Sequence, residues 1–284
     1  MKVTLLGTGT PWVDLNRQGP AVLIQSGDDT ILIDAGRGAV YQAQKVNVSA
    51  DKINPVFITH HHFDHFGDLF DVILSSWTAG RTTPLKIFGP SGTSDIVSAL
   101  VEGVYGKDIH FRVDECAATG NTHLDGSNIA KLETHEVKEP GLIYETKQLQ
   151  VKAEFVKHYY DSEPPRFDWK CLGYRVTSQN KSVVVSGDTV SCEGLDRLAK
   201  GADLLIQCCI SANADNQHEQ GKHLTSYVLP ASTEVGEIAS RANVTKLVLT
   251  HIAAYASLDK MVTDVRKAYT GELIIGEDLL EIEV

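Results

Sequence analysis

The run Thr59-His60-His61-His62-Phe63-Asp64-His65 places four metal-binding side chains within six residues, in the pattern H-x-H-x-D-H. It follows Pro55-Val56-Phe57-Ile58, an apolar stretch that predicts a short buried strand. Residues two positions apart in an extended chain point the same way, so the two histidines of H-x-H can bind one ion together. The aspartate and last histidine stand where a helix over 66–76 begins and can face a second ion. Imidazole with carboxylate suits zinc, and also iron or manganese.

Three later residues complete a set large enough for two ions. His158, Asp188 and His251 each follow a predicted strand, at its carboxyl end. A sheet holds the backbone at such positions while the side chain reaches into the cleft. We expect His158 to join the H-x-H pair on one ion, His251 to join the aspartate and last histidine on the other, and Asp188 to bridge them. The alternative is that these three are ordinary turn and strand-end residues.

Size and composition predict a single α/β domain over residues 1–284. Of its residues 42% are hydrophobic and 22% charged, and no linker or low-complexity block divides the chain. The first residues enter a strand at once, so no signal peptide is expected, and no apolar run reaches the length of a membrane span. The five cysteines form no C-x-x-C pair, which favours free thiols and a cytoplasmic location. They are Cys116, Cys171, Cys192, Cys208 and Cys209.

The pattern of predicted elements favours a layered fold. Strands are predicted at 3–6, 21–25, 30–33, 56–59, 85–88, 149–155, 171–177, 182–185, 203–207 and 246–249, with two short strands at the end of the chain. Helices are predicted at 38–45, 66–76, 90–104, 195–200, 233–241 and 259–269. The middle of the chain, 109–157, is expected to be irregular and rich in strand. Two β-rich halves, each edged by helices, predict a four-layer αββα sandwich.

Gly7-Thr8-Gly9 is a second motif to account for. A dinucleotide-binding fingerprint needs a third glycine and a helix directly after the second, and Pro11 and Trp12 do not supply them. We therefore expect a tight loop between two strands, close to the metal site.

These motifs resemble the metallo-β-lactamase superfamily, and most closely its ribonuclease Z-like branch. The resemblance spans nearly the whole chain. It is carried by Leu5-Leu6-Gly7-Thr8-Gly9-Thr10-Pro11, Leu32-Ile33-Asp34-Ala35-Gly36, the run at 59–65, Leu172-Gly173-Tyr174-Arg175, Ser186-Gly187-Asp188-Thr189 and Leu249-Thr250-His251. It implies the αββα sandwich, two divalent metal ions per chain with zinc the usual occupant, hydrolytic chemistry and, in close relatives, a homodimer.

A dinuclear site predicts a hydrolase that uses a hydroxide bridging the two metals. Asp64 is placed to orient that hydroxide or to take its proton. The leaving group also needs an acid. In ribonuclease Z relatives a histidine before the penultimate helix fills this role, but Leu229 stands at that position here. His223 could substitute from a nearby loop; the alternative is that it is a solvent-exposed loop histidine.

Aromatic side chains near the expected site are candidates for substrate contacts. They are Trp77, Tyr159, Phe167 and Trp169. The segment 159–169 is long for a hairpin loop, so its aromatic residues could line a pocket beside the metals. The alternative is that Phe167 and Trp169 only cover the edge of a sheet.

Charge and length bear on the substrate. The net charge is −11, and no arm comparable to the tRNA-clamping arm of ribonuclease Z is evident. Proteins that grip nucleic acid carry a basic face, so nucleic acid is disfavoured as a partner. We expect a small ester as substrate, with a phosphodiester or an aryl sulfate preferred. The alternatives are a ribonuclease Z-type tRNA 3′-processing endoribonuclease, a lactone or thioester hydrolase, and a non-catalytic metal-binding protein.

Overall fold

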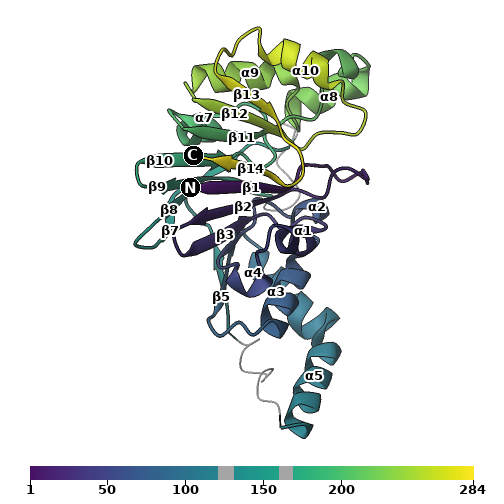
Figure 1. Ribbon diagram of the computed structural model, residues 1–284. Helices are drawn as coiled ribbons and strands as arrows, with labels where there is room; N and C mark the ends of the chain where they lie inside the picture. Colours follow the sequence, from purple (N-terminus) through teal and green to yellow (C-terminus); the bar gives the residue numbers. More distant parts are fainter. Residues whose placement is uncertain (121–130, 160–168) are drawn as a thin grey trace.

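The computed structural model describes residues 1–120, 131–159 and 169–284. Within these ranges the strands form two mixed sheets that pack face to face, and helices cover the outer face of each sheet (Figure 1). The four-layer αββα sandwich predicted from the sequence is therefore confirmed. Among the described helices, none has both the length and the apolar character that crossing a bilayer requires.

The first sheet has seven strands and is built mainly from the amino-terminal half of the chain. The last strand of the chain returns to pair antiparallel with the first, so the two ends of the chain meet on one sheet (Figure 1). In spatial order the strands are β14 (Leu280–Glu283), β1 (Lys2–Gly7), β2 (Ala21–Ser26), β3 (Asp29–Ile33), β4 (Val56–Phe57), β5 (Leu85–Gly89) and β6 (Leu132–Glu136).

The second sheet also has seven strands and comes from the carboxyl-terminal half. Its central strands β10, β11 and β12 run parallel to one another, so their carboxyl ends lie at one edge of the sheet. In spatial order the strands are β13 (Glu272–Ile275), β12 (Lys246–Thr250), β11 (Leu204–Cys208), β10 (Lys181–Val185), β9 (Cys171–Ser178), β8 (Gln150–Val156) and β7 (Gly141–Glu145).

Helices cover both outer faces. The first sheet packs against side chains of α1, α3 and α4, and the second against α7, α9 and α10. The α-helices are α1 (Ala39–Lys45), α2 (Phe63–Phe66), α3 (Leu69–Thr78), α4 (Thr93–Ser98), α5 (Gly106–Ala118), α7 (Glu193–Ala199), α8 (Glu219–Tyr227), α9 (Ser232–Arg241) and α10 (Leu258–Val265). A π-helical stretch, η2 (Ala99–Val104), follows α4, and short 3-10 turns are η1 (Ala50–Lys52) and η3 (Asn213–Asn216).

The central strands are apolar on both faces because each sheet lies between two layers. In β2, Val22 and Ile24 face the core between the sheets, while Ala21 and Leu23 face the helices outside. Successive residues of a strand point to opposite faces, so this position requires a continuous apolar run instead of an alternating one.

Two segments differ from the prediction. The stretch beginning at residue 109 was expected to be rich in strand, but α5 is a helix that projects from the sandwich (Figure 1). Its few buried positions include Ile109 and Cys116, one face of a helix, and the polar residues between them hide that period in the sequence. The segment around His223 was expected to be a loop, and it is helix α8.

Candidate metal centre

The candidate ligands reach one place from both sheets. His60 follows β4 of the first sheet, whereas His158, Asp188 and His251 follow β8, β10 and β12 of the second. His251 has φ of 55°, a left-handed backbone conformation that turns the chain sharply at the strand end. Strands that end at the interface between two packed sheets deliver their side chains to a common site.

All seven predicted ligands lie in two groups. The first group contains His60, His62, His158 and Asp188, and the second contains Asp64, His65 and His251. Within each group the candidate ligand atoms all lie within 4.8 Å of one another. Only His62 is exposed; the other six side chains are buried. The tertiary structure therefore brings together residues that are up to 191 positions apart in the chain. The histidines and Asp64 divide as expected, while Asp188, expected as a bridge, falls in the first group.

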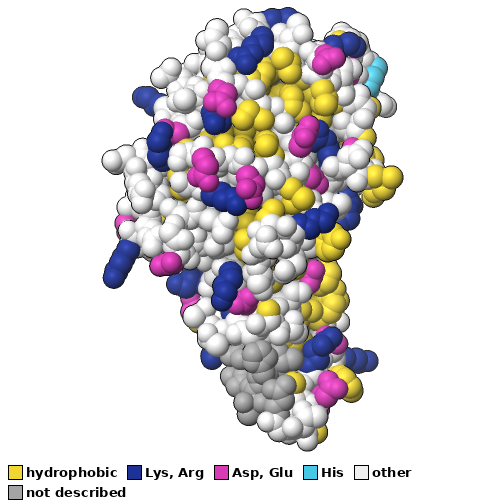
Figure 2. All heavy atoms as spheres, in the orientation of Figure 1, with side chains coloured by type: hydrophobic (Ala, Val, Ile, Leu, Met, Phe, Trp, Pro, Cys, Tyr) yellow, Lys and Arg dark blue, Asp and Glu magenta, His cyan; other side chains and the backbone are white. Residues whose placement is uncertain are grey.

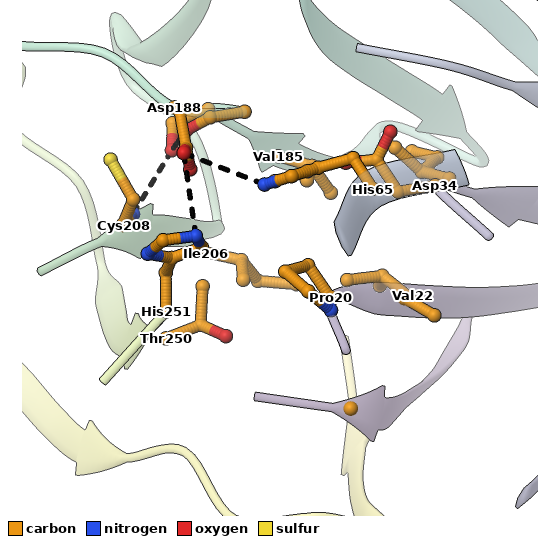
Figure 3. A pocket seen from close by; sticks show the side chains of 15 residues that line it. Pro20, Val22, Asp34, His65, Val185, Asp188, Ile206, Cys208, Thr250 and His251 are labelled. Atoms are coloured by element: carbon orange, nitrogen blue, oxygen red, sulfur yellow. Dashed lines mark hydrogen bonds and ion pairs between the residues drawn. The ribbon is translucent and has the colours of Figure 1, made fainter. Parts of the chain in front are cut away.

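Asp188 lies between the two groups. Its Oδ2 is 3.9 Å from His60 Nε2 and 3.6 Å from His158 Nε2, both in the first group. The same oxygen is 3.4 Å from His65 Nε2 and 3.3 Å from His251 Nε2, both in the second. Figure 3 shows Asp188 between His65 and His251. A carboxylate oxygen that faces nitrogens of both groups is in the position of a bridging ligand.

Asp34 orients one histidine of each group. Its Oδ2 is 2.7 Å from His65 Nδ1 and accepts a hydrogen bond from Thr59 Oγ1 at 2.9 Å. Thr59 Oγ1 in turn is 3.0 Å from Nδ1 of His60. Metal-binding histidines commonly use the second ring nitrogen in this way, which turns Nε2 toward the ion. Asp34 is not among the ligands expected from the sequence. The signal that could have identified it is an acid at the end of an apolar strand, before Ala35-Gly36.

The other histidines of the first group are also oriented. His158 Nδ1 donates to the backbone oxygen of Val228 at 2.7 Å, which leaves Nε2 for the centre. His62 presents the opposite nitrogen: its Nδ1 is 2.9 Å from His60 Nε2 and 3.1 Å from His158 Nε2. Three ring nitrogens so close together are stable only where no two of them carry facing protons, or where a cation lies among them.

The pKa values of the histidines in the first group favour the binding of a cation. Burial lowers the pKa of His60 well below its usual value. At His62, whose side chain is partly exposed, partial burial of the ring together with the charge of His158 lowers the pKa to about 4. Burial likewise lowers the pKa of His158. These imidazoles are neutral near pH 7, which is the form that binds metals. Burial raises the pKa of Asp188, but His251 and His65 outweigh it and hold that pKa well below the usual range.

His65 in the second group behaves differently. Burial lowers its pKa, but the carboxylates of Asp188 and Asp34 outweigh burial and raise the pKa well above the usual value. For Asp64, burial raises the pKa, and hydrogen bonding and charge from His251 with the charge of His65 lower it overall. Without an ion, the second group therefore holds a proton on His65 that a metal must displace.

The residues present fit two divalent ions. Four buried polar atoms at the centre have no hydrogen-bond partner among the described residues: Asp64 Oδ1, His65 Nε2, Asp188 Oδ1 and His251 Nδ1. Buried polar groups are normally paired, so such a cluster of unpaired atoms marks a place where a ligand satisfies them. A donor set of imidazole nitrogen and carboxylate oxygen suits zinc, manganese or iron.

The predicted aromatic contacts divide into three cases. The Trp169 ring is half-buried, with its centroid 5.0 Å from that of His62, so it borders the centre. Tyr159 is exposed next to His158. Trp77 is 0% exposed and packs with Ile109 in a separate cluster between helices, which corrects its assignment as a substrate contact. Phe167 lies outside the described residues.

The candidate acid lies on a helix. His223 is exposed on α8, with its ring centroid 5.0 Å from that of Tyr227. Leu229, which occupies the place of the acid in the resemblance, is 5% exposed in an apolar cluster with Cys208 and Ile210. A buried aliphatic side chain donates no proton, so any general acid must come from elsewhere.

Comparison with known proteins agrees with this geometry. The model of the beta-lactamase superfamily domain matches residues 29–252. Ribonuclease Z of Mycobacterium bovis (strain BCG / Pasteur 1173P2) is 32% identical over 292 residues, which cover 100% of this chain and 98% of that protein. Among solved structures, the metallo-beta-lactamase fold protein YhfI from Bacillus subtilis has a TM-score of 0.73 at 22% identity and covers 100% of this chain and 98% of its own. Human tRNase Z, short form, has a TM-score of 0.71 at 22% identity, with 100% and 99% covered.

Proposed function

From the premise that the chain belongs to the metallo-β-lactamase superfamily, in its ribonuclease Z-like branch, we propose that it is a metal-dependent phosphodiester hydrolase of the ribonuclease Z type, which cleaves a tRNA precursor at its 3′ end. The observation that carries the proposal is the convergence of four histidine Nε2 atoms on Asp188 Oδ2, within 3.3 to 3.9 Å. The residues of the two groups would hold two cations, which would supply the Lewis acidity used to hydrolyse phosphate esters.

Similarity to Ribonuclease Z changes the substrate preference that composition predicted. A small ester was preferred because the chain shows no long arm. The alignment with the M. bovis protein covers 100% of this chain and 98% of the relative, so no long arm distinguishes the two. The lack of an arm is therefore no argument against an RNA substrate, and nucleic acid is the partner proposed here. A cytoplasmic location and a homodimer stay predictions.

The side chains of the centre have separate parts in the reaction. Divalent ions held by the two groups would supply Lewis acidity and lower the pKa of an attacking water. Asp34 fixes the rings of His60 and His65 so that both Nε2 atoms face Asp188. Asp64 Oδ1 has no hydrogen-bond partner among the described residues and its pKa is lowered by His251, so it is an ionised base that can accept the proton of that water.

Two further side chains are assigned on the substrate side. Trp169 lies against His62 and offers an aromatic face next to the first group, which suits a nucleobase or an aryl group. Tyr159 is exposed and adjacent to His158 in the chain, which supports its assignment to the same substrate. His223 on α8 is the candidate that protonates the leaving oxygen, since Leu229 cannot.

A small phosphodiester or aryl sulfate is the second candidate substrate, because of charge. The net charge is −11, and on the face seen in Figure 2 the Lys and Arg side chains stand singly among Asp and Glu instead of forming a strip. A tRNA backbone is bound through several phosphates at once, each of which needs a cation or a hydrogen-bond donor. A small ester does not need several such contacts at once.

One assay separates these candidates. The zinc- or manganese-loaded protein is given a labelled tRNA precursor with a 3′ trailer, a chromogenic phosphodiester and a chromogenic aryl sulfate in parallel. We expect a single cut at the 3′ end of the tRNA, and loss of more than about 100-fold of that activity in Asp64→Ala with the fold intact. Turnover of a small ester with an uncut tRNA precursor would favour the second candidate. Full activity of Asp64→Ala would exclude its role as base.

A further inference from the structure

Asp278 accepts four hydrogen bonds from segments far away in the chain. It lies in the turn between β13 and β14. Its Oδ1 accepts from Thr8 N at 3.0 Å and from Thr8 Oγ1 at 2.8 Å. Its Oδ2 accepts from Gln18 N at 2.6 Å and from Gln42 Nε2 at 3.2 Å. An ionised carboxylate holds such donors more firmly than a neutral acceptor does. One side chain thus ties both ends of the loop between β1 and β2 to the carboxyl-terminal turn.

The Thr8 end of this loop leads to His251. The backbone oxygen of Thr8 accepts from Ile252 N at 2.9 Å, and Ile252 directly follows His251. Because His251 has φ of 55°, its ring direction depends on this contact holding the chain after the turn. Arg17 reinforces the same point by donating to Thr8 Oγ1 and to Gly276 O, both at 2.6 Å.

The Gln18 end leads to Asp64. Gly19 follows Gln18, and a Cβ at Gly19 would lie 3.0 Å from the backbone oxygen of Asp64. A Cβ at Gly36, which lies next to Gly19, would lie 2.4 Å from that same oxygen. The loop backbone therefore packs directly on the backbone of Asp64, and a shift of Gln18 is transmitted to that residue.

We propose that Asp278 is a positioning residue for the second metal group: through Thr8 and Gln18 it sets the places of His251 and Asp64, and so the affinity of that group for its ion. The inference rests on the metal centre proposed above. Both paths end at the second group. The first group is oriented by Thr59 and by the Val228 carbonyl, and no hydrogen bond among the described residues joins Asp278 to either.

The test is a zinc titration of the metal-free protein against a chromogenic chelator, which resolves two binding events. In Asp278→Ala we expect one of the two events to weaken by about 10- to 100-fold, the range seen when partners of metal ligands are removed, while the other is unchanged. Asp278→Asn keeps one acceptor oxygen and should fall between this variant and the wild type. His251→Ala should remove the same event, and adding Asp278→Ala to it should cost nothing further.

Asp203→Ala is the matched control. Asp203 accepts from Lys181 Nζ at 2.8 Å and from Ser182 N at 2.9 Å, at the end of the second sheet opposite to the centre. It should change neither binding event. Equal weakening of both events in Asp278→Ala, or two unchanged events, would overturn the role of Asp278. A wild-type protein that binds no zinc would instead overturn the metal centre, and with it the proposed function.

Discussion

A single buried carboxylate, Asp34, serves both halves of the centre. It holds His65 directly at 2.7 Å and His60 through the hydroxyl of Thr59. Burial raises the pKa of Asp34 and outweighs the charge and hydrogen bond of His65 and the bonds from Thr59, which lower it. Its hydrogen bonds thus determine ring directions in both metal groups.

Asp34→Asn should therefore weaken the binding of both ions, unlike a change at Asp278. An amide has one acceptor oxygen, so its NH₂ group would face either Thr59 N, which donates to Oδ1, or His65 Nδ1 and Thr59 Oγ1, which both lie at Oδ2. We expect a loss of about 10- to 100-fold in each zinc affinity, measured by chelator competition. Asp29→Asn is the control on the same strand, because Asp29 lies at the opposite end of β3 and its side chain accepts a hydrogen bond from Thr146 Oγ1, far from the centre. Unchanged affinities in Asp34→Asn would contradict this role.

His65 makes the second group sensitive to pH. Its raised pKa leaves the metal-free ring protonated at pH 7, and the ion must displace that proton. The affinity of the second group should therefore fall as pH is lowered from 8 to 6, whereas the first group, whose His62 has a pKa of about 4, should change less. Calorimetry in two buffers of different ionisation enthalpy would show proton release when the second group binds its ion. No release at pH 7 would contradict a protonated His65.

At the scale of elements, α8 carries His223, the side chain proposed above as the proton donor. His223 is exposed on this helix, whereas Leu229, which the resemblance aligns with the acid of ribonuclease Z relatives, is buried after it. A helix holds its side chains in fixed directions, so a proton donor on α8 is positioned more precisely than one in a loop would be.

His223→Ala should slow substrates with poor leaving groups more than those that release nitrophenolate. A general acid matters only where the leaving oxygen needs a proton, and its loss costs about 10²- to 10⁴-fold there. The check is kcat/KM for an alkyl and a nitrophenyl phosphodiester. His110→Ala, an exposed histidine on α5, is the control and should affect neither. An equal loss for both substrates in His223→Ala would refute an acid role.

At the scale of the whole molecule, the sandwich depends on aromatic rings between its two sheets. Phe57 of β4 stacks on Phe88 of β5, with ring centroids 5.0 Å apart, and contacts Tyr174 of the second sheet at 5.4 Å. The Tyr174 hydroxyl also donates to the backbone oxygen of Ile58, 2.7 Å away. Because this contact lies two residues before the first histidine of the metal motif, packing of the two sheets and geometry of the centre are linked.

Phe57→Ala should reduce the free energy of unfolding by about 3–5 kcal/mol, the usual cost of removing a buried phenyl ring. Phe111→Ala on α5 removes the same ring from a site that is 65% exposed, and should stay within about 0.5 kcal/mol of the wild type. Denaturant unfolding of the metal-free proteins measures both. We expect one transition, since the core joins both sheets; two separate transitions would contradict the single domain predicted for residues 1–284.

The sequence by itself determined the fold class, the family and the seven candidate ligands. Local rules carry that information: a strand followed by H-x-H-x-D-H, and an acid or histidine after each later strand. The separation of His60 and His62 from Asp64 and His65 could also be anticipated, because residues two apart in an extended chain share a face, whereas the aspartate and the last histidine lie where a helix begins.

Tertiary structure alone decided the supporting contacts. These contacts join segments that are distant in sequence: Asp34 binds His65, the Val228 carbonyl binds His158, and Asp278 binds Thr8. Tertiary structure also decided the packing of Trp77 against α5 and the helical form of α5 and α8. Short-range pattern fixes what a residue can bind, whereas the packing of the two sheets fixes which residues come within hydrogen-bonding distance.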